Sequence, residues 1–260
     1  MLARQTLGAI KRHLHTSTSR ATLWSFLDTP EPASVYSYAH QNSLAEPTPI
    51  QEIRLAAVAK DPAEAQKMIS PLQGAFLAHL VHMQRPQRIL ELGCYKGYSA
   101  CWLAHALRSV HTEPVQQPCL WTCERDPSIA ETATLNIAQA GYADIATVLP
   151  QPAQLVLECW DPDKKLDLVF IDANKSAYKL YYDLILDRDL LSDNGQILVD
   201  NVLLHGRVHG LVPEQSTSMA QSKKTMAYKI SKFNKYVADD TRTSQTLLPI
   251  FDGLLLIHKK

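Results

Sequence analysis

The stretch RILELGCYKGYS, residues 88–99, decides the fold of this chain. It begins as a short apolar run, Arg88–Leu92, which is typical of a buried strand. Gly93 and Gly97 follow, and they allow a tight turn and a close approach of the backbone to a ligand before a helix begins. Their spacing is G-x-x-x-G rather than the G-x-G-x-x-G of a pyrophosphate cradle, and the acid Glu91 precedes the turn. This unit therefore favours a cationic ligand over a phosphate.

The alternation of strand and helix continues from this unit towards the carboxyl terminus. It predicts an α/β fold with a Rossmann-like, doubly wound and mostly parallel sheet that carries helices on both faces. Two further apolar runs, Leu247–Ile250 and Leu254–Ile257, are joined by a short turn and predict an antiparallel C-terminal hairpin at the edge of the sheet. The other expected strands are Leu120–Glu124, Ala146–Leu149, Leu166–Ile171 and Gln196–Val199, and the expected helices are Tyr98–Leu107, Pro127–Ala140, Ala153–Cys159, Ala177–Asp189 and 226–238.

The segment before this unit is expected to be helical and punctuated by proline. We expect residues 28–260 to form a single domain, with N-terminal helices over 28–83 and a sheet that binds cofactor and metal over 84–260. The expected N-terminal helices are Ala33–Ala45, Ile50–Ala59, Pro62–Ile69 and Gln73–Met83.

Residues 1–27 differ in composition from the rest of the chain. They contain no acidic residue, four basic residues and a cluster of Ser and Thr at 16–19. Such a composition is typical of a mitochondrial transit peptide. The sequence therefore predicts a leader and a mitochondrial location, and the alternative is a basic tail on a cytoplasmic protein.

The overall composition argues against several classes of protein. Lys and Arg together number 26, as do Asp and Glu, and no basic stripe indicates nucleic-acid binding. The five cysteines are odd in number and lack a CxxC pair, so a disulfide framework is not expected. No apolar run approaches the roughly 20 residues of a membrane-spanning helix. These features, with 46% hydrophobic residues, favour one globular α/β domain.

Side-chain oxygens follow two strands of the predicted sheet. FIDANK, residues 170–175, places Asp172 after one strand, and ILVDN, residues 197–201, places Asp200 and Asn201 after the next. A carboxylate beside an apolar strand is costly unless it is paired, hydrogen-bonded or bound to a metal. An all-oxygen set without His or Cys predicts Mg²⁺, with Mn²⁺ or Ca²⁺ as alternatives, rather than zinc. The competing interpretation is a helix cap and a polar turn.

Lys175 follows Asp172 by three residues, beside the predicted cation. It is therefore the candidate general base, and an ordinary surface lysine is the alternative. Tyr178, Tyr181 and Tyr182 come next on the same predicted helix. One of these tyrosines could reach a cofactor, and core packing is the alternative for each.

The second predicted strand ends in Glu124. An acid at this place commonly accepts hydrogen bonds from the ribose of an adenosine cofactor. His205 and His209 are interpreted as loop residues rather than metal ligands, because glycines flank their segment. The Gln- and Ser-rich stretch Leu211–Lys224 is expected to be a mobile loop and a candidate lid.

Four of these segments together resemble a known family. They are the stretches 88–99, 170–175, 199–202 and 248–254, and the similarity extends over roughly residues 65–260. The chain resembles the cation-dependent class I O-methyltransferases, which include caffeoyl-CoA and catechol O-methyltransferases. The resemblance implies S-adenosylmethionine as methyl donor, a divalent cation, a small-molecule phenolic acceptor and a homodimer.

The resemblance also implies roles for particular residues. Lys175 and Asp172 correspond to catalytic positions. The implied metal ligands are Asp172, Asp200 and Asn201. The implied cofactor-binding residues are Glu91, Gly93, Cys94, Ser99, Glu124, Ala153, Asp172 and Tyr181.

The chain departs from the family pattern at two positions. Asn174 stands where many members carry a second Asp, and Gln151 stands where many carry Gly. Asparagine can hydrogen-bond but adds no charge, and the glutamine side chain could crowd or contact the adenine. Neither departure affects the predicted metal ligands.

The expected reaction is an SN2 transfer of the methyl group to a phenolic, catechol-like hydroxyl. A phenol is mostly protonated at neutral pH, and a divalent cation would lower its pKa and hold the oxygen in line. Two alternatives are a nicotinamide-dependent oxidoreductase on the same type of sheet and a non-catalytic module that binds S-adenosylmethionine. The missing G-x-G-x-x-G counts against the first, and the intact Asp, Asn and Lys set counts against the second.

Overall fold

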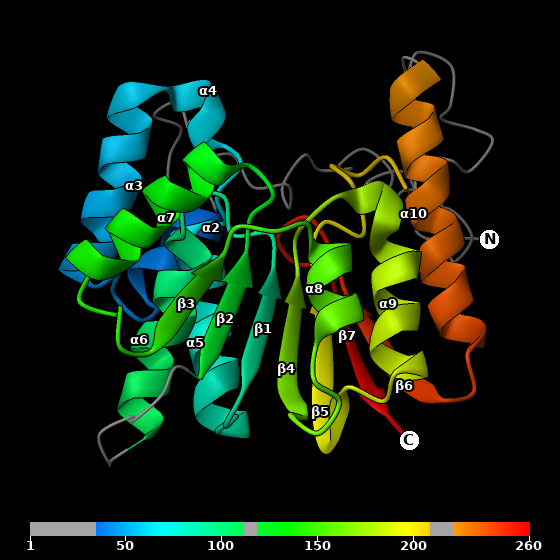
Figure 1. The fold of residues 1–260 in the computed structure, drawn as a ribbon. Helices are drawn as coiled ribbons and strands as arrows, with labels where there is room; N and C mark the ends of the chain where they lie inside the picture. The colour runs from blue at the N-terminus through cyan, green and yellow to red at the C-terminus, as the bar shows by residue number, and fades with distance from the viewer. Residues whose placement is uncertain (1–34, 112–118, 209–220) are drawn as a thin grey trace, which may run out of the picture.

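The computed structural model describes residues 35–111, 119–208 and 221–260 (Figure 1). Seven strands form one sheet in the order β3-β2-β1-β4-β5-β7-β6. The predicted leader and most of the predicted lid lie outside the described residues. The strands are β1 (Ile89–Leu92), β2 (Leu120–Cys123), β3 (Ala146–Leu149), β4 (Leu166–Ile171), β5 (Leu191–Val199), β6 (Thr243–Leu248) and β7 (Leu254–Lys259).

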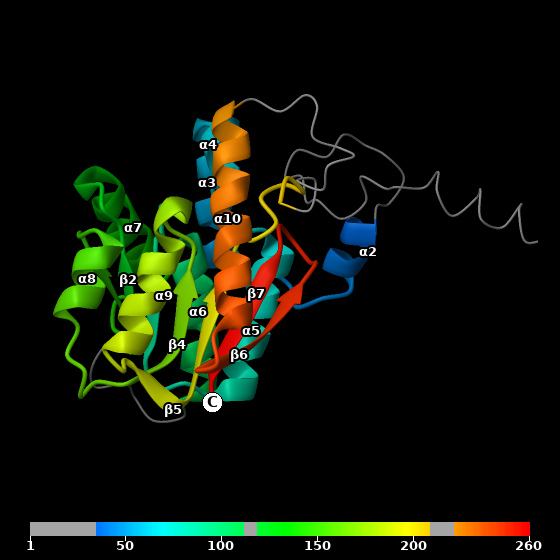
Figure 2. The ribbon, with the colours of Figure 1, turned by 90° about the vertical axis from the view of Figure 1, so that its right-hand side faces the viewer.

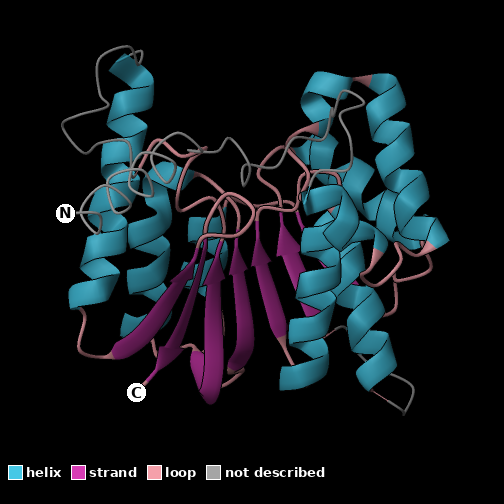
Figure 3. Ribbon diagram, turned by 180° about the vertical axis from the view of Figure 1, so that it is seen from behind, coloured by secondary structure: helices cyan, strands magenta, loops and turns pink. Residues whose placement is uncertain are grey.

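The strand directions confirm the predicted fold class. Strands β1 to β5 pair in parallel, whereas β7 pairs antiparallel with both β5 and β6. The parallel strands therefore end at the same edge of the sheet, and Figure 3 shows their arrowheads converging on the loops of that edge. Ligands of such sheets bind beyond this edge, so the fold itself indicates where to look for a site.

Two strands, β5 and β6, begin several residues earlier than predicted. Strand β6 covers Thr243–Leu248 rather than Leu247–Ile250, because the polar residues 243–246 pair with β7 while the Pro249 region forms the turn. Strand β5 begins at Leu191, five residues before the predicted start, and its register with β4 shifts there. In β6 the polar residues 243–246 pair with β7 through their backbone, whereas in the early part of β5 only Leu191 pairs with β4, before the register shift.

Helices cover both faces of the sheet, as predicted (Figures 1 and 3). Helices α3, α5 and α6 pack on one face, and helices α8, α9 and α10 pack on the other. The helices are α2 (Val35–Gln41), α3 (Thr48–Lys60), α4 (Pro62–Ala65), α5 (Pro71–Gln84), α6 (Tyr98–Val110), α7 (Pro127–Gln139), α8 (Ala153–Cys159), α9 (Tyr178–Asp187), preceded by the 3-10 turn η1 (Lys175–Ala177), and α10 (Gln221–Asp239).

The two cores follow from the alternation of side chains along each strand. In β4, Leu168 and Phe170 belong to the core beneath α5 and α6, while Val169 and Ile171 belong to the core beneath α8 and α9. Successive side chains of a strand point to opposite faces, so a strand covered on both faces reads as a continuous apolar run. Burial of these runs is the main force that holds the sheet between its helices.

Helix α5 packs closely against α6. A Cβ atom at Gly74 would lie 2.3 Å from Nε1 of Trp102, so only glycine allows this approach. The side chain of Ser70 accepts a hydrogen bond from the backbone N–H of Gln73 and caps the start of the helix. Helix α4 is shorter than predicted and ends at Ala65.

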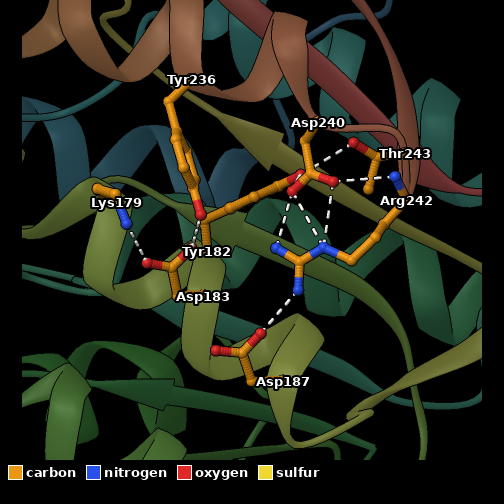
Figure 4. Close-up of polar contacts among 8 residues, drawn as sticks. All are labelled: Lys179, Tyr182, Asp183, Asp187, Tyr236, Asp240, Arg242 and Thr243. Carbon is orange, nitrogen blue, oxygen red and sulfur yellow. Dashed lines mark hydrogen bonds and ion pairs between the residues drawn. The ribbon is translucent and has the colours of Figure 1, made fainter.

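A polar cluster fastens α9, α10 and β6 together (Figure 4). The hydroxyl of Tyr182 donates to Asp240 at 3.1 Å and lies 2.9 Å from the Thr243 hydroxyl. Arg242 pairs with both Asp240 and Asp187. Figure 2 shows α10 along the side of the molecule next to β6 and β7. This cluster holds α9 against the end of α10 and the start of β6.

Two global features of the described residues are plain. No helix among them is both long and apolar enough to cross a membrane. All five cysteines are free thiols, and only Cys159 is exposed.

Candidate active site

A cavity of about 800 Å³ opens at the carboxyl edge of the parallel strands. Its walls come from the loops after β1, β2, β3, β4 and β5, from the segment between α4 and α5, and from the turn between β6 and β7. The predicted site residues that line it are Gly93, Cys94, Ser99, Glu124, Ala153, Asp172, Lys175, Tyr181, Asp200 and Asn201. The structure thus brings together residues from five separate strand ends.

The glycine turn after β1 holds the loops at the centre of the cavity close together. Gly93 has a φ of +91°, and a Cβ atom there would lie 2.5 Å from the backbone oxygen of Asp172. The N–H groups of Gly93 and Cys94 both donate to the carbonyl of Cys123 at 3.1 Å. Because no side chain intervenes, the loops after β1, β2 and β4 meet directly and form the cavity floor.

Glu91 lies beneath this floor rather than in the wall. It is fully buried, is not a lining residue of the cavity, and accepts a hydrogen bond from the Thr122 hydroxyl. Its Oε1 atom has no hydrogen-bond partner. Burial raises the pKa of Glu91 to about 7. The predicted contact between Glu91 and the cofactor therefore stays a prediction.

The loops after β2 and β3 form one side of the cavity. Glu124 lines it, and its Oε1 accepts a hydrogen bond from the N–H of Asp126 at 2.9 Å. Ala153, Tyr181 and Gln151 line the same cavity. Glu124 therefore lines the cavity with one carboxylate oxygen held by the backbone, and its contact with a ribose stays a prediction.

The predicted metal ligands meet on the other side. Asp200 is only 2% exposed, and its pKa is raised, first by burial and then by the charge of Asp172. Two carboxylates that repel one another, next to the amide of Asn201, are an arrangement that a hard cation would stabilise. Their oxygens therefore fit a divalent cation chemically. Within residues 35–111, 119–208 and 221–260, no group of three or more His, Cys, Asp or Glu is placed to hold a metal, and the predicted set contains only two acids.

Lys175 lies directly beside these carboxylates. Its Nζ is 3.5 Å from Oδ1 of Asp172. The side chain of Asn174 accepts hydrogen bonds from the N–H and the hydroxyl of Ser176 and so caps the turn that carries Lys175. Asn174 thus has a local structural role, while it also lines the cavity.

Comparison with known proteins assigns the chain to a family. Residues 40–260 match the model of the O-methyltransferase family. The chain belongs to this family. Its α/β architecture and the clustering of residues at one sheet edge agree with that assignment.

Three individual proteins illustrate the relationship. The O-methyltransferase ankF of Aspergillus thermomutatus is 29% identical over 199 residues, which cover 74% of this chain and 79% of ankF. A catechol O-methyltransferase of Niastella koreensis is 33% identical over 199 residues, 72% of this chain and 80% of that protein. The crystal structure of the Podospora anserina methyltransferase PaMTH1 with S-adenosylhomocysteine (SAH) superposes with a TM-score of 0.78 at 31% identity and covers 92% and 100% of the two chains.

This O-methyltransferase uses S-adenosylmethionine as its methyl donor. The expectation of an enzyme that transfers methyl groups is thereby confirmed, and the oxidoreductase and non-catalytic alternatives are set aside. The roles of individual residues stay predictions. Their common position around one cavity is what the structure adds to them.

The site of the O-methyltransferase also contains residues that sequence reasoning missed. Gln73 lines the cavity and donates from Nε2 to Oδ2 of Asp200 at 2.8 Å. Asp252, in the turn between β6 and β7, accepts a hydrogen bond from the N–H of His205, and the Asn201 side chain hydrogen-bonds to it. The available signals were a glutamine near the start of a mostly apolar helix and an acid between Phe251 and Gly253.

His205 keeps its predicted place in a loop but belongs to the cavity wall. Its Nδ1 lies 3.6 Å from Oδ2 of Asp252. His209 lies outside the described residues. Of the three predicted tyrosines, Tyr181 lines the cavity, whereas Tyr178 is buried and donates to the backbone oxygen of Asp200 at 3.0 Å.

Proposed function

We propose that this O-methyltransferase is metal-dependent and transfers the methyl group to a phenolic hydroxyl of a catechol-like small molecule. The observation that carries the proposal is the position of Asp172. It lies in one cavity with the loops after β1 and β2 on one side and with Asp200, Asn201 and Lys175 on the other. Methyl donor and acceptor oxygen would therefore meet at this residue.

Asp172, Asp200 and Asn201 would hold the divalent cation, with Mg²⁺ favoured by the oxygen ligands. When bound, the cation would lower the pKa of the acceptor hydroxyl and fix its orientation. Nζ of Lys175 lies 3.5 Å from Oδ1 of Asp172, so its amino group is held beside the proposed cation site. A divalent cation bound there would disfavour the ammonium form, and the neutral amine of Lys175 would then accept the proton of the acceptor hydroxyl as general base.

The acceptor class draws support from the relatives. Among them are proteins named as a catechol O-methyltransferase, a caffeoyl-CoA O-methyltransferase and a flavonoid 3',5'-methyltransferase. Two adjacent hydroxyls can occupy neighbouring positions around one cation, which favours catechols over simple phenols. The homodimer and the mitochondrial location stay predictions and are not needed for this proposal.

The test is methyl transfer from labelled S-adenosylmethionine to a catechol, to a phenol with a single hydroxyl and to an aliphatic alcohol. The protein is first treated with a chelator and then assayed with and without added Mg²⁺. We expect methylation of the catechol that depends on Mg²⁺ and much weaker methylation of the other two acceptors. Undiminished methyl transfer in the presence of the chelator would overturn the proposed metal dependence. Equal rates with all three acceptors would overturn the proposed preference for catechols.

A further inference from the structure

Gln73 connects the N-terminal helices to the proposed cation site. It is only 4% exposed, lies on α5, and is far from Asp200 in sequence. Its Nε2 donates to Oδ2 of Asp200 at 2.8 Å, while Oδ1 of Asp200 accepts from the N–H of Asn201 at 2.7 Å. Each carboxylate oxygen is thus held by one N–H group, and rotation of the carboxylate is fixed from two sides.

The packing of α5 determines where this glutamine reaches. Gly74 allows the helix to lie against the indole of Trp102, where any Cβ atom would clash. The Ser70 cap accepts a hydrogen bond from the N–H of Gln73 itself at 3.0 Å. Backbone and side chain of Gln73 are therefore both constrained, and its amide is set at one position in the cavity wall.

We propose that Gln73 is a positioning residue that fixes the orientation of the Asp200 carboxylate and thereby makes the site select Mg²⁺ and Mn²⁺ over Ca²⁺. The inference rests on the proposed metal dependence. A glutamine amide donates a hydrogen bond without adding charge, so it orients the carboxylate and leaves its attraction for a cation intact.

The selectivity follows from the different demands of the cations. Mg²⁺ requires near-ideal octahedral geometry, whereas Ca²⁺ accepts more ligands in a flexible arrangement. If the Asp200 carboxylate is free to rotate, the site therefore loses more binding affinity for Mg²⁺ than for Ca²⁺. Loss of a hydrogen bond that orients a metal ligand typically weakens metal binding about 10-fold to 100-fold.

The test measures cation binding directly on the full chain in the absence of acceptor. Mn²⁺ binding is followed by electron paramagnetic resonance, and Mg²⁺ and Ca²⁺ are titrated as competitors. The variant is Gln73→Met, which keeps the length of the side chain and removes the donor. The matched control is Gln84→Met, because Gln84 also lies on α5 and donates to a backbone oxygen of the sheet, that of Asp167. Binding of SAH shows that each variant is folded.

We expect Gln73→Met to bind Mn²⁺ and Mg²⁺ about 10-fold or more weakly, with a smaller loss for Ca²⁺, while Gln84→Met behaves as wild type. An equal loss for all three cations, or no loss, in a variant that still binds SAH overturns the proposal. If Gln73→Met does not bind SAH, the variant Gln73→Leu is measured by the same criteria. Wild-type protein that binds none of the cations refutes the proposed metal dependence itself, which is a distinct result.

Discussion

Nζ of Lys175 lies 3.5 Å from Oδ1 of Asp172, so the candidate base and a candidate metal ligand form one ion pair. Both side chains are partly buried and line the same cavity. Positioned proton transfer contributes about 10²-fold to 10⁴-fold to a rate. We therefore expect Lys175→Met to lower kcat within this range and to leave the affinity for SAH unchanged.

The measurements are steady-state kinetics with a catechol acceptor and calorimetry with SAH. Lys179→Met is the matched control, because Lys179 is more exposed and pairs with Asp183 on the same helix. If Lys175→Met keeps the wild-type kcat, Lys175 is not the general base.

Asp200→Asn should separate cation binding from cofactor binding. Asparagine keeps the shape of the side chain and can still accept the hydrogen bond of Gln73, but it lacks the charge that attracts a cation. We expect Mg²⁺ binding, measured by calorimetry, to be lost while SAH still binds. Asp126→Asn is the control, since this residue also lines the cavity and asparagine caps helices well. Equal cation affinity in Asp200→Asn and wild type would contradict the proposed ligand set.

Glu91 should make the stability of the ligand-free protein depend on pH. Its pKa is raised by burial from 4.5 to about 7 in the folded protein, so the folded state binds more protons than the unfolded state between these values. Stability attributable to Glu91 is therefore present below pH 4.5 and falls as the pH rises through 7, by about 3 kcal/mol in total.

The check is chemical denaturation of wild type and Glu91→Gln between pH 4 and pH 8. The glutamine variant should lose less stability over this interval, because it has no proton to release. Glu158→Gln, a change at an exposed glutamate, should follow the wild-type curve. Parallel curves for wild type and Glu91→Gln would show that the buried carboxyl does not titrate in this range.

Tyr182 should contribute to the stability of the cluster that joins α9, α10 and β6. Its hydroxyl is buried between Asp240 and Thr243, so Tyr182→Phe leaves both partners without this hydrogen bond. The expected cost is about 1–3 kcal/mol in the free energy of unfolding. Tyr236→Phe removes the hydroxyl that donates to Asp183 at a more exposed place and should cost less. Equal losses in the two variants, measured by urea denaturation, would contradict this ranking.

Much of the candidate site could be predicted because residues that directly follow parallel strands lie at the same edge of the sheet. The strands β4 and β5 were recognisable as apolar runs, and the residues after them, Asp172 and Asp200, had to emerge at the same edge. The glycines after β1 were recognisable for a similar reason, since only a close approach of backbones requires them at this spacing.

The secondary structure was less predictable where polar residues pair through the backbone. The segment 243–246 has no apolar alternation, yet it forms the first part of β6 because β7 offers its free edge. Helical periodicity predicted a helix over Pro62–Ile69, but it could not show that this helix ends at Ala65. Local pattern determines which segments are apolar, and pairing with a distant segment decides where an element stops.

The sequence by itself determined the doubly wound sheet, the family and the edge at which Asp172, Lys175, Asp200 and Asn201 gather. Only the tertiary structure decided that Glu91 lies beneath the cavity floor and that Gln73 holds the carboxylate of Asp200. The physical reason is that strand order and side-chain alternation are periodic and local. The reach of Gln73 depends instead on how deeply α5 packs against Trp102, a contact that no local pattern encodes.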